Sequence, residues 1–177
     1  MSGDTISIEP IGEQHIEGFR RTVDVVARER RYLAGVEGFS PEATREFVAG
    51  ILDGAGVSFV AIHEARVVGW CDVVRRPFEG FQHSGTLGMG LLPEYRGQGI
   101  GQRLLESAVA AAAGHGFARI ELEVYASNTV AIRLYERFGF VTEGLKRAAR
   151  ILDGQTDDLV CMAYFPQAQE QQKGDPT

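Results

Sequence analysis

Cysteine is scarce in this sequence, and its scarcity excludes two classes of small protein. Only Cys71 and Cys161 are present among 177 residues, and their spacing suggests neither a disulfide framework nor a zinc site. A disulfide framework or a zinc site needs cysteines grouped at short intervals. Each of the two lies in an apolar run typical of a strand. We therefore expect two reduced thiols in the core and no metal site.

Long apolar runs and an excess of positive charge are absent as well. No stretch approaches the ~20 apolar residues that cross a bilayer, and the first residues lack the basic start and apolar core of a signal peptide. Lys and Arg number 18 against 24 Asp and Glu, a formal charge of -6, the wrong sign for wrapping nucleic acid. We expect a cytoplasmic protein that binds neither membrane nor nucleic acid and attracts amines.

What remains is the composition of an ordinary globular enzyme. Hydrophobic residues make up 44% of the chain and charged residues 24%, enough apolar material for one core at this length. We expect a single domain over residues 4–165. Residues 166–177 carry no large apolar side chain, and ordering them would cost entropy without burial, so we expect a disordered tail.

Hydrophobic periodicity predicts an α/β (α+β) fold. Alternation by two predicts strands, and recurrence at helical intervals predicts helices. The expected strands cover residues 5–9, 57–63, 67–74, 84–92, 119–125, 140–146 and 158–165, and the expected helices cover 13–30, 41–52, 97 to 114 or 116, and 128–138. Ser40, followed by Pro41 and Glu42, is a helix start. This order predicts a mixed, mostly antiparallel sheet of about seven strands, flanked by about four helices.

The segment RGQGIG, Arg96 to Gly101, carries the strongest chemical signal. It follows the fourth strand and opens the longest amphipathic helix, where backbone N–H groups without partners converge at the positive end of the helix dipole. Glycine at 97, 99 and 101 lets a phosphate approach, and Arg96 can add a charge-assisted hydrogen bond. A plain tight turn is the alternative, but it seldom needs three alternating glycines. We predict a phosphate-bearing ligand.

Two common phosphate motifs do not fit this loop. The P-loop pattern needs Lys and Ser or Thr after its last glycine, where Gln102 and Arg103 stand. The dinucleotide pattern needs glycine at the position of Gln102. Nucleotide hydrolysis and NAD binding are therefore disfavoured.

The loop resembles the signature of the GNAT superfamily of N-acetyltransferases, which reads Gln or Arg, two residues, Gly, one residue, then Gly or Ala. Arg96, Gly99 and Gly101 match it, and the likeness extends over LGMGLLPEYRGQGIGQRLLE and NTVAIRLYERFGF. The strings GWCDVV, LGMG and DGQTDDLVCMAYF resemble the amino-acid and phosphinothricin acetyltransferase branch. The resemblance implies a GNAT-type fold, acetyl-CoA as co-substrate and a homodimer.

The resemblance also assigns the cofactor site. It implies contacts to coenzyme A from Met89, Gly90, Leu91, Arg96, Gly97, Gln98, Gly99, Ile100, Gly101 and Asn128. It further implies that Tyr135 protonates the departing thiolate. Seven residues separate Asn128 and Tyr135, which places them on one face of a helix. Taken alone, Asn128 is also an ordinary N-cap and Tyr135 an ordinary core aromatic.

The base that deprotonates the amine is harder to assign. Asp72 is the first candidate, because it interrupts the apolar run VVGWCDVV. Glu123, on the opposite face from Leu122, is the second. In the phosphinothricin branch a Glu on the fourth strand does this work. Thr86 occupies the matching position here, and His83 is a weaker substitute. For each of these side chains a purely structural role is the alternative.

Three functions are compatible with this pattern. The first is transfer of an acetyl group to the primary amine of a small molecule, such as an amino acid or an analogue, by direct attack in a ternary complex. Acetylation of a protein N-terminus, as by ribosomal-protein alanine acetyltransferases, is an alternative because those enzymes share both motifs. A sensor that binds acyl-CoA without turnover would keep the glycine loop and need no acid or base.

Overall fold

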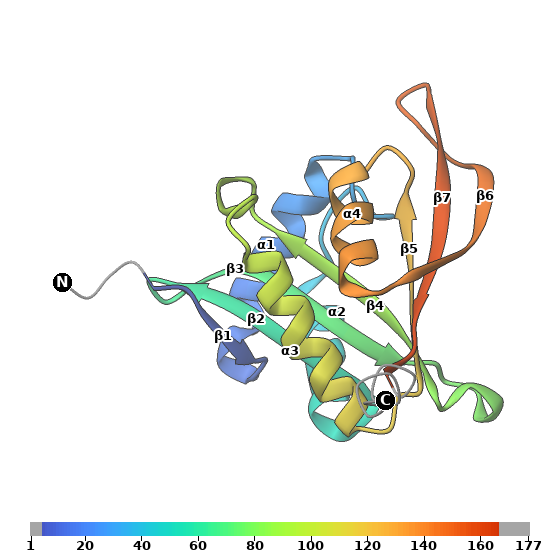
Figure 1. The fold of residues 1–177 in the computed structure, drawn as a ribbon. Coiled ribbons are helices and arrows are strands. Elements are labelled where there is room, and N and C mark those ends of the chain that lie inside the picture. Colours follow the sequence, from blue (N-terminus) through green and yellow to red (C-terminus); the bar gives the residue numbers. More distant parts are fainter. Residues whose placement is uncertain (1–4, 167–177) are drawn as a thin grey trace.

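The computed structural model describes residues 5–166, which form one seven-stranded sheet covered by helices on both faces (Figure 1). Its strands are β1 (Ser7–Pro10), β2 (Gly56–His63), β3 (Arg66–Arg75), β4 (Ser84–Leu91), β5 (Arg119–Tyr125), β6 (Val141–Leu152) and β7 (Gln155–Tyr164). Its α-helices are α1 (Ile16–Arg28), α2 (Pro41–Gly50), α3 (Ile100–Gly114) and α4 (Thr129–Phe138). The predicted fold class is confirmed. The predicted tail, apart from Pro166, lies outside the described residues.

The strands lie in the order β1-β2-β3-β4-β5-β7-β6, and every neighbouring pair is antiparallel except β4 and β5. Because successive side chains of a strand point to opposite faces, the sheet supports two cores. One lies under α3 and α4 and includes Cys71, Leu104 and Leu122. The other lies under α1 and α2 and includes Phe19 and Trp70. The two faces are used differently at the functional site.

Helix boundaries follow the expected local chemistry. The Ser40 hydroxyl accepts a hydrogen bond from the Ala43 N–H at 3.1 Å, which caps α2 as predicted. Helix α4 ends at Gly139, whose φ of 113° lies in the left-handed region. The buried residues of α3 form the predicted apolar face, namely Ile100, Leu104, Leu105, Ala108, Val109 and Ala112. No helix among residues 5–166 is long and apolar enough to cross a membrane.

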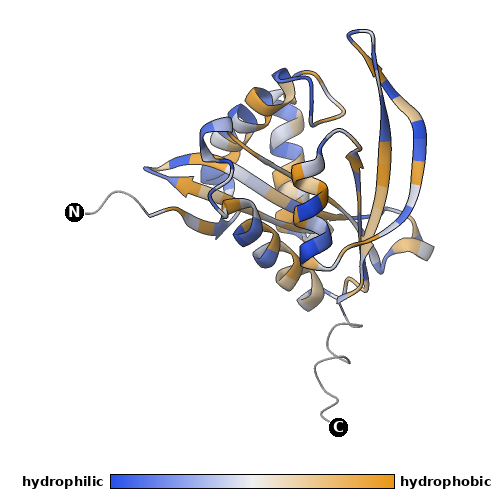
Figure 2. Ribbon diagram, turned by 45° about the horizontal axis from the view of Figure 1, so that its top comes forward, coloured by the Kyte–Doolittle hydropathy of each residue, from blue (hydrophilic) through white to orange (hydrophobic). Residues whose placement is uncertain are grey.

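The last hairpin differs from its prediction. β6 and β7 extend to a turn at Asp153 and Gly154, well beyond the predicted 140–146 and 158–165. Residues 147–157 are mostly polar, and the register shifts between Lys146 and Arg150, so the alternation that marks a strand is broken there. Figure 2 shows the hairpin standing apart from the helices, with hydrophilic and hydrophobic segments following each other along both strands.

The two cysteines also differ from each other. Both are free thiols, as predicted. Cys71 is fully buried, but Cys161 is only partly buried. Its partner on β6 in the strand register is Gly144, which has no side chain to cover it. The prediction of a second core thiol was therefore wrong.

Candidate functional site

The sheet opens between its two parallel strands. β4 and β5 pair only through Ser84 with Arg119, Gly85 with Ile120, and Thr86 with Glu121. Beyond this point β4 stays paired with β3, and β5 stays paired with β7. The two strands therefore diverge into a gap that begins after Thr86 (Figure 1).

The edge of β4 presents main-chain groups to this gap. The Leu92 N–H bonds to the Val68 carbonyl of β3 at 2.9 Å. Backbone groups of an antiparallel strand alternate in direction, so those of Gly90 also face β3, whereas those of Met89 and Leu91 face the gap. The backbone groups of Met89 and Leu91 therefore border the gap, and those of Gly90 do not.

Two glycines of β4, Gly85 and Gly90, are explained by packing. A Cβ atom on Gly90 would overlap the Trp70 ring, and one on Gly85 would lie 2.6 Å from both Phe117 and Val73. Large side chains from neighbouring elements occupy the space that a side chain at these positions would need. These glycines serve packing.

The glycine loop fits a bound anion. Gly97 and Gly99 have φ values of 74° and 77°, and a Cβ atom at either would meet nothing within 4 Å. Among the described residues, no backbone carbonyl accepts from the N–H groups of Gly97, Gln98 and Gly99, and the N–H groups of the first helical turn lack intrahelical partners. A Cβ on Gly101 would lie 3.4 Å from the Met89 side chain. The loop therefore continues directly from the edge of the gap.

The side chain of Arg96 points elsewhere. Its Nε and Nη2 donate to the Leu91 carbonyl at 3.0 and 2.8 Å, and its Nη1 donates to Glu29 Oε2 at 2.8 Å. Nη2 also donates to the second oxygen of Glu29. These bonds to Glu29 raise the pKa of Arg96. The guanidinium that we expected to contact a phosphate is thus held by protein groups.

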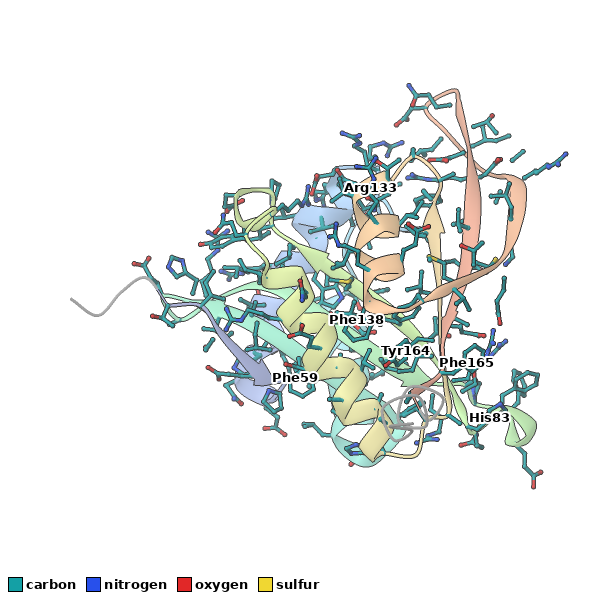
Figure 3. All side chains as sticks on the ribbon, in the orientation of Figure 1. Phe59, His83, Arg133, Phe138, Tyr164 and Phe165 are labelled. Atoms are coloured by element: carbon teal, nitrogen blue, oxygen red, sulfur yellow. The ribbon has the colours of Figure 1, made fainter. Side chains whose placement is uncertain are left out.

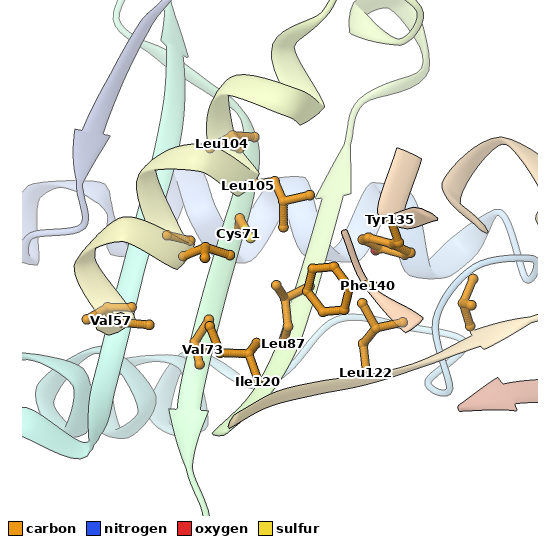
Figure 4. Close-up of a cluster of buried hydrophobic side chains, with 14 of the residues drawn as sticks. Val57, Cys71, Val73, Leu87, Leu104, Leu105, Ile120, Leu122, Tyr135 and Phe140 are labelled. Carbon is orange, nitrogen blue, oxygen red and sulfur yellow. The ribbon is translucent and has the colours of Figure 1, made fainter. Parts of the chain in front are cut away.

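The predicted acid lies on the α3 side of the sheet. Tyr135, on α4, is 6% exposed and packs at 5.6 Å, centroid to centroid, from the Phe140 ring (Figure 4). Burial raises the pKa of Tyr135 above its usual value, so the phenol carries its proton at neutral pH. Asn128 takes the N-cap role, since its Oδ1 accepts from the Ala131 N–H at 3.3 Å.

The first candidate base lies on the opposite face. Asp72, in the middle of β3, is 9% exposed and pairs with Ser58 on one side and Gly88 on the other. Burial raises the pKa of Asp72 from 3.8 to about 7. Its oxygen Oδ1 lies 3.3 Å from the place a Gly88 Cβ would occupy. The carboxyl group thus faces the strand that borders the gap.

The other candidates are less suited to proton transfer. Glu123 lies on the same face as Asp72, but its side chain is 47% exposed and forms an ion pair with Lys146. His83 is exposed before the start of β4, at the closed end of the gap (Figure 3). Thr86 is exposed and lies where the two strands part.

A charged cavity of about 410 Å³ lies on this face, beside the point where β4 and β5 part. Its lining consists of Arg76, Thr86, Arg119, Glu121, Leu122, Glu123, Glu143, Lys146, Cys161 and Met162. The six charged residues are paired: Glu121 accepts from Arg76 at 2.7 Å and from Arg119 at 3.1 Å, and Arg119 also donates to Glu143 at 2.8 Å. Three cations balance three anions.

Sequence reasoning missed most of this cavity. Arg76, Glu121 and Glu143 come from three separate strands or their ends, so no local spacing brings them together. The one available signal was the alternation in 119–125, which puts Arg119, Glu121 and Glu123 on one face. Among residues 5–166, no group of three or more His, Cys, Asp or Glu is arranged to hold a metal ion.

Comparison with known proteins agrees with this geometry. The model of the acetyltransferase (GNAT) family matches residues 23–140. A ribosomal protein bS18-alanine N-acetyltransferase of Escherichia coli is 38% identical over 71 residues, which cover 40% of this chain and 48% of that protein. The N-alpha-acetyltransferase 30 of Schizosaccharomyces pombe is 33% identical over 108 residues, 60% of this chain and 71% of that one.

A solved structure shares the fold. The phosphinothricin acetyltransferase of Sinorhizobium meliloti, in complex with AcCoA, superposes with a TM-score of 0.85 at 20% identity and covers 91% of this chain and 88% of its own. The present chain spans about half the length of the bacterial curated relatives that it matches.

Proposed function

Because this chain belongs to the acetyltransferase (GNAT) family, we propose that it transfers the acetyl group of acetyl-CoA to the primary amine of a small molecule. The acceptor that best fits the structure carries a carboxylate as well as an amine, as an amino acid or an analogue does. Attack is direct, within a ternary complex.

Main-chain groups hold the co-substrate in this proposal. The free N–H groups of Gly97, Gln98 and Gly99, with those of the first turn of α3, bind the diphosphate of coenzyme A. The gap-facing N–H and carbonyl groups of Met89 and the N–H group of Leu91 bind the amides of the pantetheine arm, since the Leu91 carbonyl already accepts from Arg96. Support comes from the open space around Gly97 and Gly99 and from the contact between Gly101 and the edge of β4.

The two faces of the sheet divide the chemistry. The acceptor approaches from the side of Asp72, which removes a proton from the ammonium group so that the nitrogen lone pair can attack. A C–N bond forms to the acetyl carbon and the C–S bond breaks. Tyr135, on the α3 side, gives its proton to the departing thiolate, and the second proton that the nitrogen loses after attack restores the phenol. The gap between β4 and β5 connects the face that carries Asp72 with the face that carries Tyr135.

The mixed charge of the cavity favours a zwitterion. A ligand with one ammonium and one carboxylate can separate one existing ion pair, such as Arg76 with Glu121, pair with both of its members and leave no charge without a partner. Its carboxylate would bind Arg76 or Arg119. Glu121, released from that guanidinium, would attract the ammonium group into the cavity, and Asp72 would take its proton. A simple amine would leave a guanidinium unpaired, and removing a charge from its partner costs free energy.

Acetylation of a protein N-terminus is the second candidate, favoured by the names of the relatives from E. coli and S. pombe. A peptide N-terminus has no α-carboxylate beside its amine, so it cannot make this exchange of ion pairs. An acyl-CoA sensor, the third candidate, would need neither Asp72 nor Tyr135.

A thiol-release assay separates these functions. The protein is given acetyl-CoA with amino acids, with the corresponding amines that lack the carboxylate, and with peptides that begin with alanine. We expect release with amino acids, and we expect Arg76→Gln to raise KM for the amino acid but not for the amine. Release with peptides alone would favour the second candidate. Silence with all acceptors despite tight acetyl-CoA binding would favour the sensor.

The proposal extends to the domain bounds, the oligomeric state and the location of the protein. We propose one domain over residues 4–165, a homodimer and a cytoplasmic location. Light scattering after size-exclusion chromatography measures the oligomeric state directly, and a mass equal to one chain would contradict the dimer.

A further inference from the structure

The guanidinium of Arg96 has almost no capacity left for a ligand. Of its five N–H donors, two bond to the Leu91 carbonyl and two to the carboxylate of Glu29. The ring of Tyr32 lies 4.8 Å from the guanidinium carbon. One N–H on Nη1 remains. A side chain committed in this way holds protein groups in place.

The groups that it holds belong to the cofactor site. Leu91 is the last residue of β4, and Arg96 itself immediately precedes Gly97. Glu29 is the C-cap of α1, 67 residues away in sequence. The Arg96 and Glu29 side chains are only 32% and 22% exposed, and a bidentate pair of this kind is geometrically specific. The pair therefore ties the end of α1 to both ends of the turn between β4 and the glycine loop.

We propose that Glu29 and Arg96 are a positioning pair for acetyl-CoA binding. Glu29 orients the Arg96 fork, and the fork fixes the Leu91 carbonyl, so that the edge of β4 and the N–H groups of the glycine loop keep the geometry in which the cofactor binds. This inference rests on the proposed function, because it assumes that acetyl-CoA is the ligand of that loop.

The direction in which Glu29→Gln changes acetyl-CoA affinity distinguishes this role from direct contact between Arg96 and a phosphate. Coenzyme A is an anion, and Glu29 is a negative charge close to its binding loop. By Coulomb's law alone, Glu29→Gln should tighten binding or leave it unchanged, and it would also release Arg96 for a phosphate. A positioning pair predicts the reverse, since the neutral amide no longer orients the fork.

The experiment measures acetyl-CoA affinity by calorimetry for the parent, Glu29→Gln, Arg96→Lys and the double variant. We expect each single variant to weaken binding about tenfold, the effect of losing a charged bidentate contact, and the double variant to add little because both residues act as one unit. Lysine keeps the charge, and Lys is itself a good phosphate ligand, so near-parent affinity in Arg96→Lys would overturn the proposal. So would tighter binding in Glu29→Gln.

Asp153→Asn is the matched control. Asp153 forms a bidentate pair with Arg30, the residue after Glu29, at 2.9 and 2.7 Å, but on the side of the β6–β7 hairpin. We expect its acetyl-CoA affinity to equal that of the parent. An equal loss in this control would assign the effect to general loosening of the segment after α1 and would overturn a specific role for Glu29.

A measurement without ligand keeps this inference separate from the proposed function. Hydrogen exchange of the free protein should be faster at the hydrogen-bonded amides of Leu92, Tyr95 and Arg96 in Glu29→Gln than in the parent or in Asp153→Asn. Unchanged exchange there would contradict the positioning role. If the parent fails to bind acetyl-CoA while this exchange pattern holds, the proposed function is wrong, but Glu29 and Arg96 still hold the loop in place.

Discussion

Replacing Asp72 with Asn tests both the energetics of a buried carboxyl group and its proposed role in proton transfer. Burial raises the pKa of Asp72 from 3.8 to about 7. The folded protein therefore binds the Asp72 proton more tightly than the unfolded chain does. The contribution of this group to stability is most favourable below pH 4, is lost as the pH rises to about 7, and is constant above that.

The magnitude follows from the two pKa values. At 1.36 kcal/mol for each pKa unit, the difference between 3.8 and about 7 corresponds to about 4 kcal/mol of lost stability at high pH. Between pH 5 and pH 8 stability is lost only over the two pH units from 5 to about 7, which corresponds to about 3 kcal/mol. Asparagine has a similar shape and cannot ionise, so Asp72→Asn should be free of this loss.

Urea unfolding at pH 5 and pH 8 measures the effect. We expect the free energy of unfolding of Asp72→Asn, relative to the parent, to rise by about 3 kcal/mol between these two values. Asp53→Asn, at an exposed position after α2, is the control and should follow the parent. Parallel stability curves for Asp72→Asn and the parent would refute the reasoning, because they would mean that the carboxyl group ionises as freely in the folded state as in the unfolded chain.

The same variant separates a catalytic from a structural Asp72. If Asp72 removes the proton of the amine, kcat/KM of the parent rises with pH through about 7, and Asp72→Asn loses that rise together with about a hundredfold in rate. A purely structural aspartate gives the stability change with an unaltered pH–rate profile.

Three further changes have expected outcomes. Tyr135→Phe should lower kcat by about a hundredfold while acetyl-CoA affinity stays within about twofold; stopped-flow turnover and calorimetry measure the two, and unchanged turnover would remove Tyr135 from the mechanism. Gly99→Ala should weaken acetyl-CoA binding. Gly154→Ala, with a similar φ of 73° and equally open surroundings, should lower stability by the backbone cost of about 1 kcal/mol and leave acetyl-CoA affinity unchanged. Equal acetyl-CoA affinities of the two variants would contradict anion binding by the glycine loop. Ser40→Ala should lower thermal stability by about 1 kcal/mol through loss of the α2 cap, and an unchanged melting temperature would argue against it.

The sequence predicted the elements that depend on local periodicity. The strand at 119–125 has the predicted bounds, and its alternation by two puts Ile120, Leu122 and Val124 on one buried face. The glycine loop was found because its signal is local: alternating glycines before an amphipathic helix. Periodicity reports which side of an element is buried and says nothing of what it is buried against.

Periodicity could not predict which side chains from distant elements contact one another. Arg96 was assigned to a phosphate because its neighbours in sequence suggest one, and its true partner, Glu29, lies on another element. Gly90 and Gly85 of β4 make room for Trp70 and Phe117, which come from other elements. In each case the deciding contact is set by strand order and helix packing, which the chain determines only as a whole.

The gap itself constrains what can bind in it. β4 is held to β3 as far as Leu91, and β5 is held to β7 as far as Tyr125, so each strand keeps an outer partner while the inner edges separate. The inner groups of Met89 and the Leu91 N–H have no strand beside them, so a ligand that displaces water from the gap must itself supply their hydrogen-bond partners. An extended ligand that carries amides can supply these hydrogen-bond partners, as a strand inserted between β4 and β5 would. This requirement favours the pantetheine arm of coenzyme A over a plain nucleotide, which could occupy the glycine loop and would leave the gap unfilled.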